Sequence, residues 1–360
     1  MDRRTFLKTT AIASAASIVP FGQAAFATEG PWRTFDVTTR VELNSTGAAS
    51  VWLPIPTVNT DYQKVLESTF KTDAGKAQIV QDATYGAGIL VAEFTGSDKP
   101  VVEVTTRVMT RDRSVDLSAA PNNEQLDPAE RKLALAATDL LPTDGIVLQT
   151  AQEITKGAKT DRAKAQAIYD WIVDNTHRDA KVRGCGVGDI KSMLESNNLG
   201  GKCGDLNALY VGLARAVGVP ARDVYGVRVA DSRLGYKSLG KSGDVTKAQH
   251  CRAEVYLAGY GWVPVDPADV RKVVLEEGGG LPLTDVKVEA ARKRLFGSWE
   301  MNWMAFNYAH DVQLPGDKKG KIGFFMYPNA MITEDGKLAR VDSLDPANFH
   351  YTITSREITG

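Results

Sequence analysis

Residues 199–222 read LGGKCGDLNALYVGLARAVGVPAR, and this segment constrains the fold of the chain more than any other. Its apolar side chains recur at the spacing of one helix face; they are Leu206, Leu209, Tyr210, Leu213 and Val217. Gly218 and Pro220 then predict the end of the helix. Cys203 stands at the predicted start, a position that a reactive cysteine needs and a structural one does not.

The pattern changes from strands to helices near residue 120. Apolar and polar residues alternate in TFDVTTRVEL and VVEVTTRVM, with VWLPIP and GILVAEF between them, so we expect an antiparallel β-sandwich over residues 31–115. Asp127 before Pro128 is typical of a helix start, within a helical connection over residues 121–159. After the cysteine helix, DVYGVRV, CRAEVYL and WVPVD read as strands. The expected fold class is therefore α+β.

The N-terminal segment, residues 1–27, resembles an export signal. Arg3 and Arg4 precede a mildly apolar Ala/Ser stretch that ends in Ala-Phe-Ala, which is typical of a twin-arginine signal peptide cleaved after about Ala27. The alternative is a membrane anchor, but the stretch is short and Ser/Thr-diluted for a span. We therefore expect a periplasmic protein with no stable membrane insertion after cleavage.

The composition excludes some classes of partner. The 360 residues carry a formal net charge of −1, which gives no sign of a nucleic-acid-binding surface. Three cysteines cannot form a full disulfide set. The sequence has no H-E-x-x-H, C-x-x-C or EF-hand pattern, so we expect neither a metal nor another cofactor.

The predicted position of Cys203 favours a nucleophilic thiolate. A helix N-terminus carries unpaired N–H groups and a partial positive charge, which promote loss of the thiol proton. The flanking residues Gly201, Lys202 and Gly204 are candidates for backbone donors to an oxyanion. Lys202 also adds positive charge.

His250 and Asp266 are candidates for the base and for the carboxylate that orients it. They flank two predicted antiparallel strands, sixteen residues apart. Both side chains lie on one sheet face only if the residue numbers of each cross-strand pair add up to an even number. This requires a hairpin loop with an odd number of residues. Asp266 could instead only cap the turn in DPADV.

The order of these segments resembles the transglutaminase-like superfamily. The resemblance covers about residues 160–270 and rests on GGKC, on ARAVGVPAR and on a histidine followed by EVYLAGYGWVPVDP. It implies a papain-like catalytic core over residues 160–275, with residues 284–360 completing it, and a Cys203–His250–Asp266 triad. Arg252 stands where many relatives have tryptophan, which implies a polar wall in the acyl channel.

Other cysteines and motifs leave alternatives open. Cys251 neighbours His250 and is expected to face the other side of its strand, in the core. Cys185 lies in a glycine-rich turn, as a structural thiol or as a disulfide partner that silences Cys203. Residues 235–242 match G-x-x-x-x-G-K-S literally, but a phosphate loop opens a helix after a strand, and we expect no helix there.

The function expected from these features is thiol-dependent acyl transfer. The chain would hydrolyse peptide or amide bonds through a thioester on Cys203, acting on a peptide or protein substrate. The alternatives are an amine-accepting transglutaminase that makes cross-links and an inactive module that binds a peptide or glycan. The sequence leaves the oligomeric state open.

Overall fold

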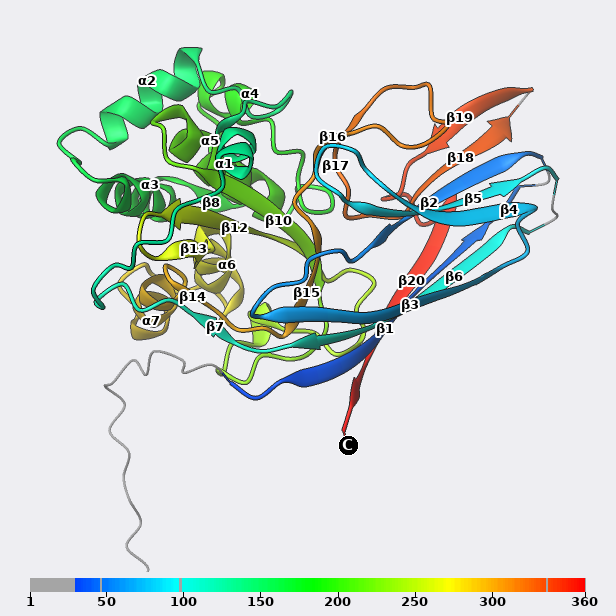
Figure 1. The fold of residues 1–360 in the computed structure, drawn as a ribbon, viewed down its shortest axis with the longest axis horizontal. Coiled ribbons are helices and arrows are strands. Elements are labelled where there is room, and N and C mark those ends of the chain that lie inside the picture. Colours follow the sequence, from blue (N-terminus) through cyan, green and yellow to red (C-terminus); the bar gives the residue numbers. More distant parts are fainter. Residues whose placement is uncertain (1–29, 46, 97–98, 335, 360) are drawn as a thin grey trace, which may run out of the picture.

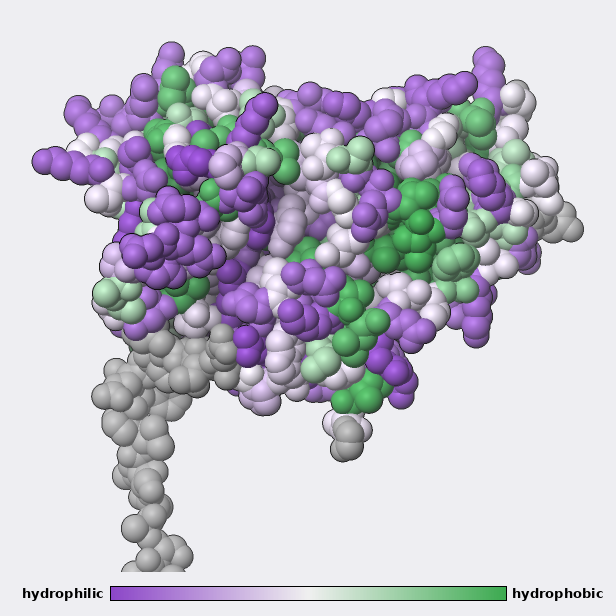
Figure 2. All heavy atoms as spheres, in the orientation of Figure 1, coloured by the Kyte–Doolittle hydropathy of each residue, from purple (hydrophilic) through white to green (hydrophobic). Residues whose placement is uncertain are grey.

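The computed structural model describes residues 30–45, 47–96, 99–334 and 336–359. They form a β-sandwich lobe and a lobe in which helices surround a third sheet (Figure 1), and the surface between the two lobes is hollowed (Figure 2). The expected α+β fold class is confirmed. The predicted signal peptide lies outside the described residues. Within the described ranges, no helix has the length and apolar character needed to cross a membrane.

The sandwich lobe consists of two five-stranded antiparallel sheets. The strand order of the first is β11 (Gly243–Asp244), β20 (Phe349–Ile358), β1 (Arg33–Leu43), β6 (Val101–Thr110) and β3 (Gln63–Thr72). That of the second is β19 (Lys337–Val341), β18 (Asn329–Glu334), β2 (Ala49–Ile55), β5 (Gly88–Phe94) and β4 (Lys76–Gln81). Side chains of both sheets, including Val41, Leu53 and Phe349, meet in one buried cluster, as in other sandwiches.

The C-terminal strands correct our expectation for residues 284–360. The sequence predicts that this segment completes the catalytic core. The helix Val286–Arg294 and the strand Trp303–Asn307 do lie in the helical lobe, but β18, β19 and β20 belong to the sandwich. β20 pairs with β1 and β18 pairs with β2, so strands from the two ends of the chain lie side by side (Figure 1). The alternation of apolar and polar residues predicts a short strand but does not indicate which sheet the strand joins. The sandwich is therefore not confined to residues 31–115.

The helical lobe contains a four-stranded antiparallel sheet, in the order β13 (Gly261–Val265), β12 (Gln249–Leu257), β10 (Ala221–Arg228) and β15 (Trp303–Asn307). Helix α5 (Cys203–Ala216) packs on β12 and β10. Its residues from Cys203 to Arg215 are all buried. The helix ends before Gly218, which has a φ of +81° as a helix-terminating glycine commonly does. A helix buried on all sides forms the core of its lobe.

The other helices of this lobe are α1 (Pro128–Leu135), α2 (Gly145–Ile154), α3 (Asp161–Asn175), α4 (Ile190–Glu195), α6 (Pro267–Glu276), α7 (Val286–Arg294) and the 3₁₀ turn η1 (Lys237–Leu239). Asp127 caps α1, as predicted. The strand pairs β7 (Arg113–Ser114) with β14 (Ser298–Trp299), β8 (His177–Arg178) with β9 (Gly200–Gly201), and β16 (His310–Val312) with β17 (Ile322–Phe324) complete the structure. The sequence predicts a turn at DPADV, whereas in the structure these residues form the start of α6.

Candidate active site

Cys203 is the first residue of α5, and only 4% of its surface is exposed. At this position the helix dipole favours a thiolate. The neighbouring thiols of Cys185 and Cys251 lower the pKa of Cys203 well below its ordinary value, and the charge of His250 lowers it further, against the effect of burial. The structure therefore provides the environment for a thiolate that the sequence predicts.

The β12–β13 hairpin has the register that the sequence argument requires. Ala253 pairs with Val265 and Leu257 pairs with Gly261, so the paired numbers have an even sum and a loop of three residues joins the strands. His250 Nε2 lies 2.7 Å from Asp266 Oδ2. Asp266 also caps α6, since it accepts a hydrogen bond from the backbone N–H of Asp269 at 3.0 Å. Asp266 therefore contacts the imidazole and caps the helix at the same time.

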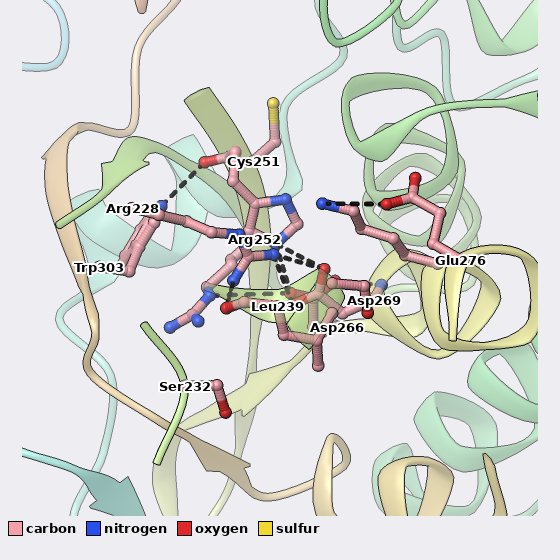
Figure 3. A network of polar contacts seen from close by, with 12 residues as sticks. Arg228, Ser232, Leu239, Cys251, Arg252, Asp266, Asp269, Glu276 and Trp303 are labelled. Carbon is pink, nitrogen blue, oxygen red and sulfur yellow. Dashed lines mark hydrogen bonds and ion pairs between the residues drawn. The ribbon is translucent and has the colours of Figure 1, made fainter. Parts of the chain in front are cut away.

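A second carboxylate lies beside the same imidazole. Asp269 Oδ1 lies 3.3 Å from His250 Nε2. Arg228 Nη2 contacts both Asp269 oxygens, at 2.7 Å and 2.9 Å, and Figure 3 shows the guanidinium and the carboxylates converging. With Nε2 held by carboxylates, Nδ1 is the ring nitrogen that remains for the thiol.

Charge around the imidazole favours its protonated form. Burial lowers the pKa of His250, but the carboxylates of Asp269 and Asp266 together with the Cys203 thiolate outweigh burial and the repulsion from Arg228, and raise the pKa to about 9. Burial beside Asp269 raises the pKa of Asp266. The arrangement favours an imidazolium that faces a thiolate on one side and carboxylates on the other.

Arg252 corrects the expectation of a polar wall in the acyl channel. It is buried behind the carboxylates, where both terminal nitrogens donate to the carbonyl oxygen of Glu300, at 3.0 Å and 3.1 Å. Its guanidinium lies over Trp303, 4.7 Å from the ring centroid, and its Nε lies 3.7 Å from Asp266 Oδ2. Arg252 thus supports the carboxylate from behind.

Two of the three oxyanion candidates already have partners. The backbone N–H of Lys202 donates to Asp205 Oδ2 at 2.9 Å, and that of Gly204 donates to the carbonyl oxygen of Cys185 at 2.7 Å, so these two predictions are wrong. Gly201 has a packing role, because an added Cβ would lie 2.6 Å from Asp205 Cβ. Among the described residues, the N–H of Cys203 itself has no hydrogen-bond acceptor.

The remaining thiols lie closer to Cys203 than the sequence indicates. The sulfur atoms of Cys185, Cys203 and Cys251 all lie within 4.8 Å of one another, and all three are free thiols. Cys251 is in the core, as expected, and its sulfur points away from Asp266 and Asp269 (Figure 3). It nevertheless reaches the sulfur of Cys203, because that face of β12 packs against α5.

A family model and a relative of similar length match this chain. The sequence profile of the transglutaminase-like superfamily matches residues 148–267. The core of this chain therefore belongs to the transglutaminase-like superfamily. A protein of Haemophilus influenzae described only as uncharacterized is 36% identical over 343 residues, which are 91% of this chain and 90% of the relative.

Two solved structures resemble this chain to different degrees. A proposed cysteine protease from Cytophaga hutchinsonii has a TM-score of 0.53 at 17% identity and covers 82% of this chain and 98% of its own. The periplasmic domain of TgpA from Pseudomonas aeruginosa has a TM-score of 0.35 at 14% identity, over 68% and 93% of the two chains. The first of these shares the fold, and membership in the superfamily supports a thiol-dependent enzyme class.

Sequence reasoning missed several residues that support the site of this superfamily member. Asn207 Nδ2 donates to Asp266 Oδ1 at 3.2 Å and to the carbonyl oxygen of Cys251 at 2.8 Å, and Trp303 Nε1 donates to the carbonyl oxygen of His250 at 3.0 Å. Asn207 lies one helical turn after Cys203, and the signal for it is a polar residue on a mostly apolar helix. Trp303 and Arg228 have no comparable signal, because only the folded sheet brings them to the site.

The G-x-x-x-x-G-K-S match is not followed by a helix. Ser242 Oγ donates to Asp231 Oδ2 at 2.8 Å, and the strand β11 begins at the next residue. The segment therefore lacks the helix N-terminus that binds phosphate in a phosphate loop.

Proposed function

We propose that the chain is an acyl-transfer enzyme that hydrolyses peptide or amide bonds through a thioester on Cys203. The observation that carries the proposal is the placement of Cys203 at the head of α5, beside an imidazole whose Nε2 lies 2.7 Å from Asp266. A nucleophile, a base and an orienting carboxylate in this order make up the arrangement used for nucleophilic catalysis.

In the proposed reaction, the Cys203 thiolate attacks the carbonyl carbon of a carboxamide. The free N–H of Cys203 donates to the oxygen that becomes negative in the tetrahedral intermediate. The His250 imidazolium transfers its proton to the leaving amine, and the C–N bond breaks to leave a thioester. His250 then takes a proton from water, which attacks the thioester and releases the acid, while Asp266 holds the ring.

The proposal includes the site of action. The sequence of residues 1–27 predicts twin-arginine export to the periplasm. A double variant, Arg3→Lys with Arg4→Lys, should retain the full-length chain in the cytoplasm. Release of the mature chain to the periplasm by this double variant would contradict export by the twin-arginine route.

An acylation experiment tests the chemistry with a small activated ester, so the natural substrate need not be identified. Purified protein that begins at Thr28 is incubated with p-nitrophenyl acetate, and the acetyl group is mapped by mass spectrometry. The expected result is an acetyl thioester on Cys203 that neutral hydroxylamine removes and that Cys203→Ala lacks. Acetylation of surface lysines alone, at the same rate in Cys203→Ala, would contradict the proposal.

The same intermediate separates hydrolysis from cross-linking. A primary amine added during turnover competes with water for the thioester. Release of acetate at an unchanged rate supports the hydrolase, whereas formation of the acetylated amine in preference to acetate supports an amine-accepting transglutaminase. No acylation at all would favour an inactive module that binds a peptide or glycan.

A further inference from the structure

Four sulfur atoms gather at the site, and one of them belongs to the proposed nucleophile. The Sγ atoms of Cys185, Cys203 and Cys251 lie within 4.8 Å of one another, and Met326 Sδ lies 4.0 Å from Cys251 Sγ. Cys251 and Met326 have no exposed surface, and Cys185 and Cys203 are only 5% and 4% exposed. We call this group of four side chains the sulfur pocket.

The sulfur pocket combines segments that are far apart in the sequence. Cys185 comes from the loop before α4, Cys203 from the head of α5, Cys251 from β12, and Met326 from the link between β17 and β18. The three cysteines are too widely spaced along the chain to form a local metal-binding motif. Only the fold brings the four sulfur atoms together.

Backbone contacts hold the Cys185 loop against the cysteine helix. The N–H groups of Val187 and Gly188 both donate to Asp205 Oδ1 at 2.9 Å, and the N–H of Gly204 donates to the carbonyl oxygen of Cys185. A Cβ at Gly186 would lie 1.8 Å from Asp205 Oδ2. The loop fits only with glycine at that position, and this close fit fixes Cys185 beside Cys203.

The donor atoms of the sulfur pocket define the ion that it suits. Thiolate and thioether sulfur select soft cations such as univalent copper, whereas calcium and magnesium require oxygen ligands. Three sulfur atoms placed about 2.3 Å from a central ion lie about 4 Å apart, which the observed limit of 4.8 Å allows after a small inward movement. The thioether of Met326 supplies a further weak ligand of the kind found in copper sites.

We propose that the sulfur pocket binds one univalent copper ion, held by Cys185, Cys203 and Cys251 with Met326 beside them. Binding replaces the S–H bonds of Cys185 and Cys251 with copper–sulfur bonds and releases their protons to solvent, while Cys203 binds as the thiolate, with no change of oxidation state. Because Cys203 is one of the ligands, a bound ion removes it from acyl transfer. The binding stands on the sulfur geometry alone, whereas the inhibition rests on the proposed function.

A competition titration tests the binding directly. Reduced protein is titrated anaerobically with univalent copper in the presence of a coloured copper chelator. The expected result is withdrawal of one copper ion per chain from the chelator, with a sulfur-to-copper charge-transfer band in the ultraviolet and no effect of added calcium or magnesium. Failure to withdraw copper, or a stoichiometry other than one copper ion per chain, would overturn the proposal.

Matched variants locate the ion. Cys185→Ser should weaken copper binding by about 100-fold or more and Met326→Leu by about 10-fold, by analogy with the loss of ligands and their supports at other metal sites. Met304→Leu is the control, because Met304 is similarly buried but outside the sulfur pocket. Equal affinities in Cys185→Ser and the native chain would contradict the assignment. Formation of a Cys185–Cys203 disulfide with peroxide, without copper binding, would also overturn it.

Acylation by p-nitrophenyl acetate separates this proposal from the proposed function. If copper binds and suppresses acylation of Cys203, both stand. If copper binds but the copper-free protein is never acylated, the metal site stands and the proposed function fails. If the copper-loaded protein is acylated as fast as the copper-free protein, Cys203 is not a ligand and the inference is wrong.

Discussion

His250 Nε2 and Asp266 Oδ2 lie 2.7 Å apart, although one residue belongs to β12 and the other follows β13 at the start of α6. The three-residue hairpin loop sets the register that makes this contact possible. Asp266 is fully buried, so the interaction is sheltered from solvent and holds the ring in one orientation.

Asp266→Asn should lower the rate of Cys203 acylation by about 10²–10⁴-fold, as expected when a base loses the group that orients it. An amide oxygen still caps α6, so the melting temperature should change little. Asp285→Asn is the matched control, because Asp285 caps α7 through the N–H of Lys287 at 2.8 Å, away from the site. An equal loss of rate in both variants would assign Asp266 a purely structural role.

The pH dependence of acylation should report the imidazolium. Burial and Arg228 lower the pKa of His250, but the charges of Asp269, Asp266 and the Cys203 thiolate outweigh them and raise this pKa to about 9. The proton donor for a leaving amine is present below this pKa, so acylation by an amide substrate should decline as the pH rises through about 9. Asp269→Asn removes one raising charge and should move the decline to lower pH. An unshifted profile in that variant would show that Asp269 does not act on the imidazole.

The glycine loop beside α5 gives a stability test with a matched control. Gly186 and Gly157 have φ values of +93° and +85°, so alanine at either position should cost about 1–2 kcal/mol in backbone strain. A Cβ at Gly157 meets nothing within 4 Å, whereas one at Gly186 would displace Asp205. Gly186→Ala should therefore cost about 1–3 kcal/mol more in urea unfolding. Equal costs would mean that the loop can move away from the helix.

Much of the candidate site could be predicted from the sequence, because its signals are local. The head of α5 follows from glycines, cysteine and apolar spacing, and the β12–β13 register follows from alternation and a short loop. Asp269 and Arg228 had no such signal, since their roles depend on the ion pair that joins α6 to β10 in the folded chain. The alternation argument placed Cys251 on the face opposite His250 but did not show that this face packs against the head of α5.

The sandwich shows the same limit on a larger scale. Alternation predicted β1 and β6 well. The pairing of β20 with β1 connects strands from opposite ends of the chain, and it depends on which edge of the sheet is unpaired once the other strands have formed. Arg252 is a third example. The resemblance implied a polar channel wall at this position, where many relatives have tryptophan, but two tryptophans and a backbone carbonyl hold Arg252 in the interior.

A buried charge cluster connects the sheet of the helical lobe to β7, the short strand that follows β6. Glu254 on β12 is fully buried and pairs with Arg113 on β7 and Arg222 on β10. Glu254→Gln leaves both guanidinium groups without their countercharge, so it should lower the free energy of unfolding by about 3–5 kcal/mol. In Glu103→Gln, which loses a partly exposed contact with Arg40, the cost should stay below about 1 kcal/mol. Chemical denaturation of both variants measures the difference.

The most direct test of the account is the rate at which iodoacetamide modifies each cysteine at neutral pH, in a reduced and metal-free sample. Cys203 should be alkylated well before Cys185 and Cys251, and a folded His250→Gln variant should lose this difference in rate. Slow and equal modification of all three cysteines in the native chain, unchanged by His250→Gln, would contradict the claim that the fold activates Cys203.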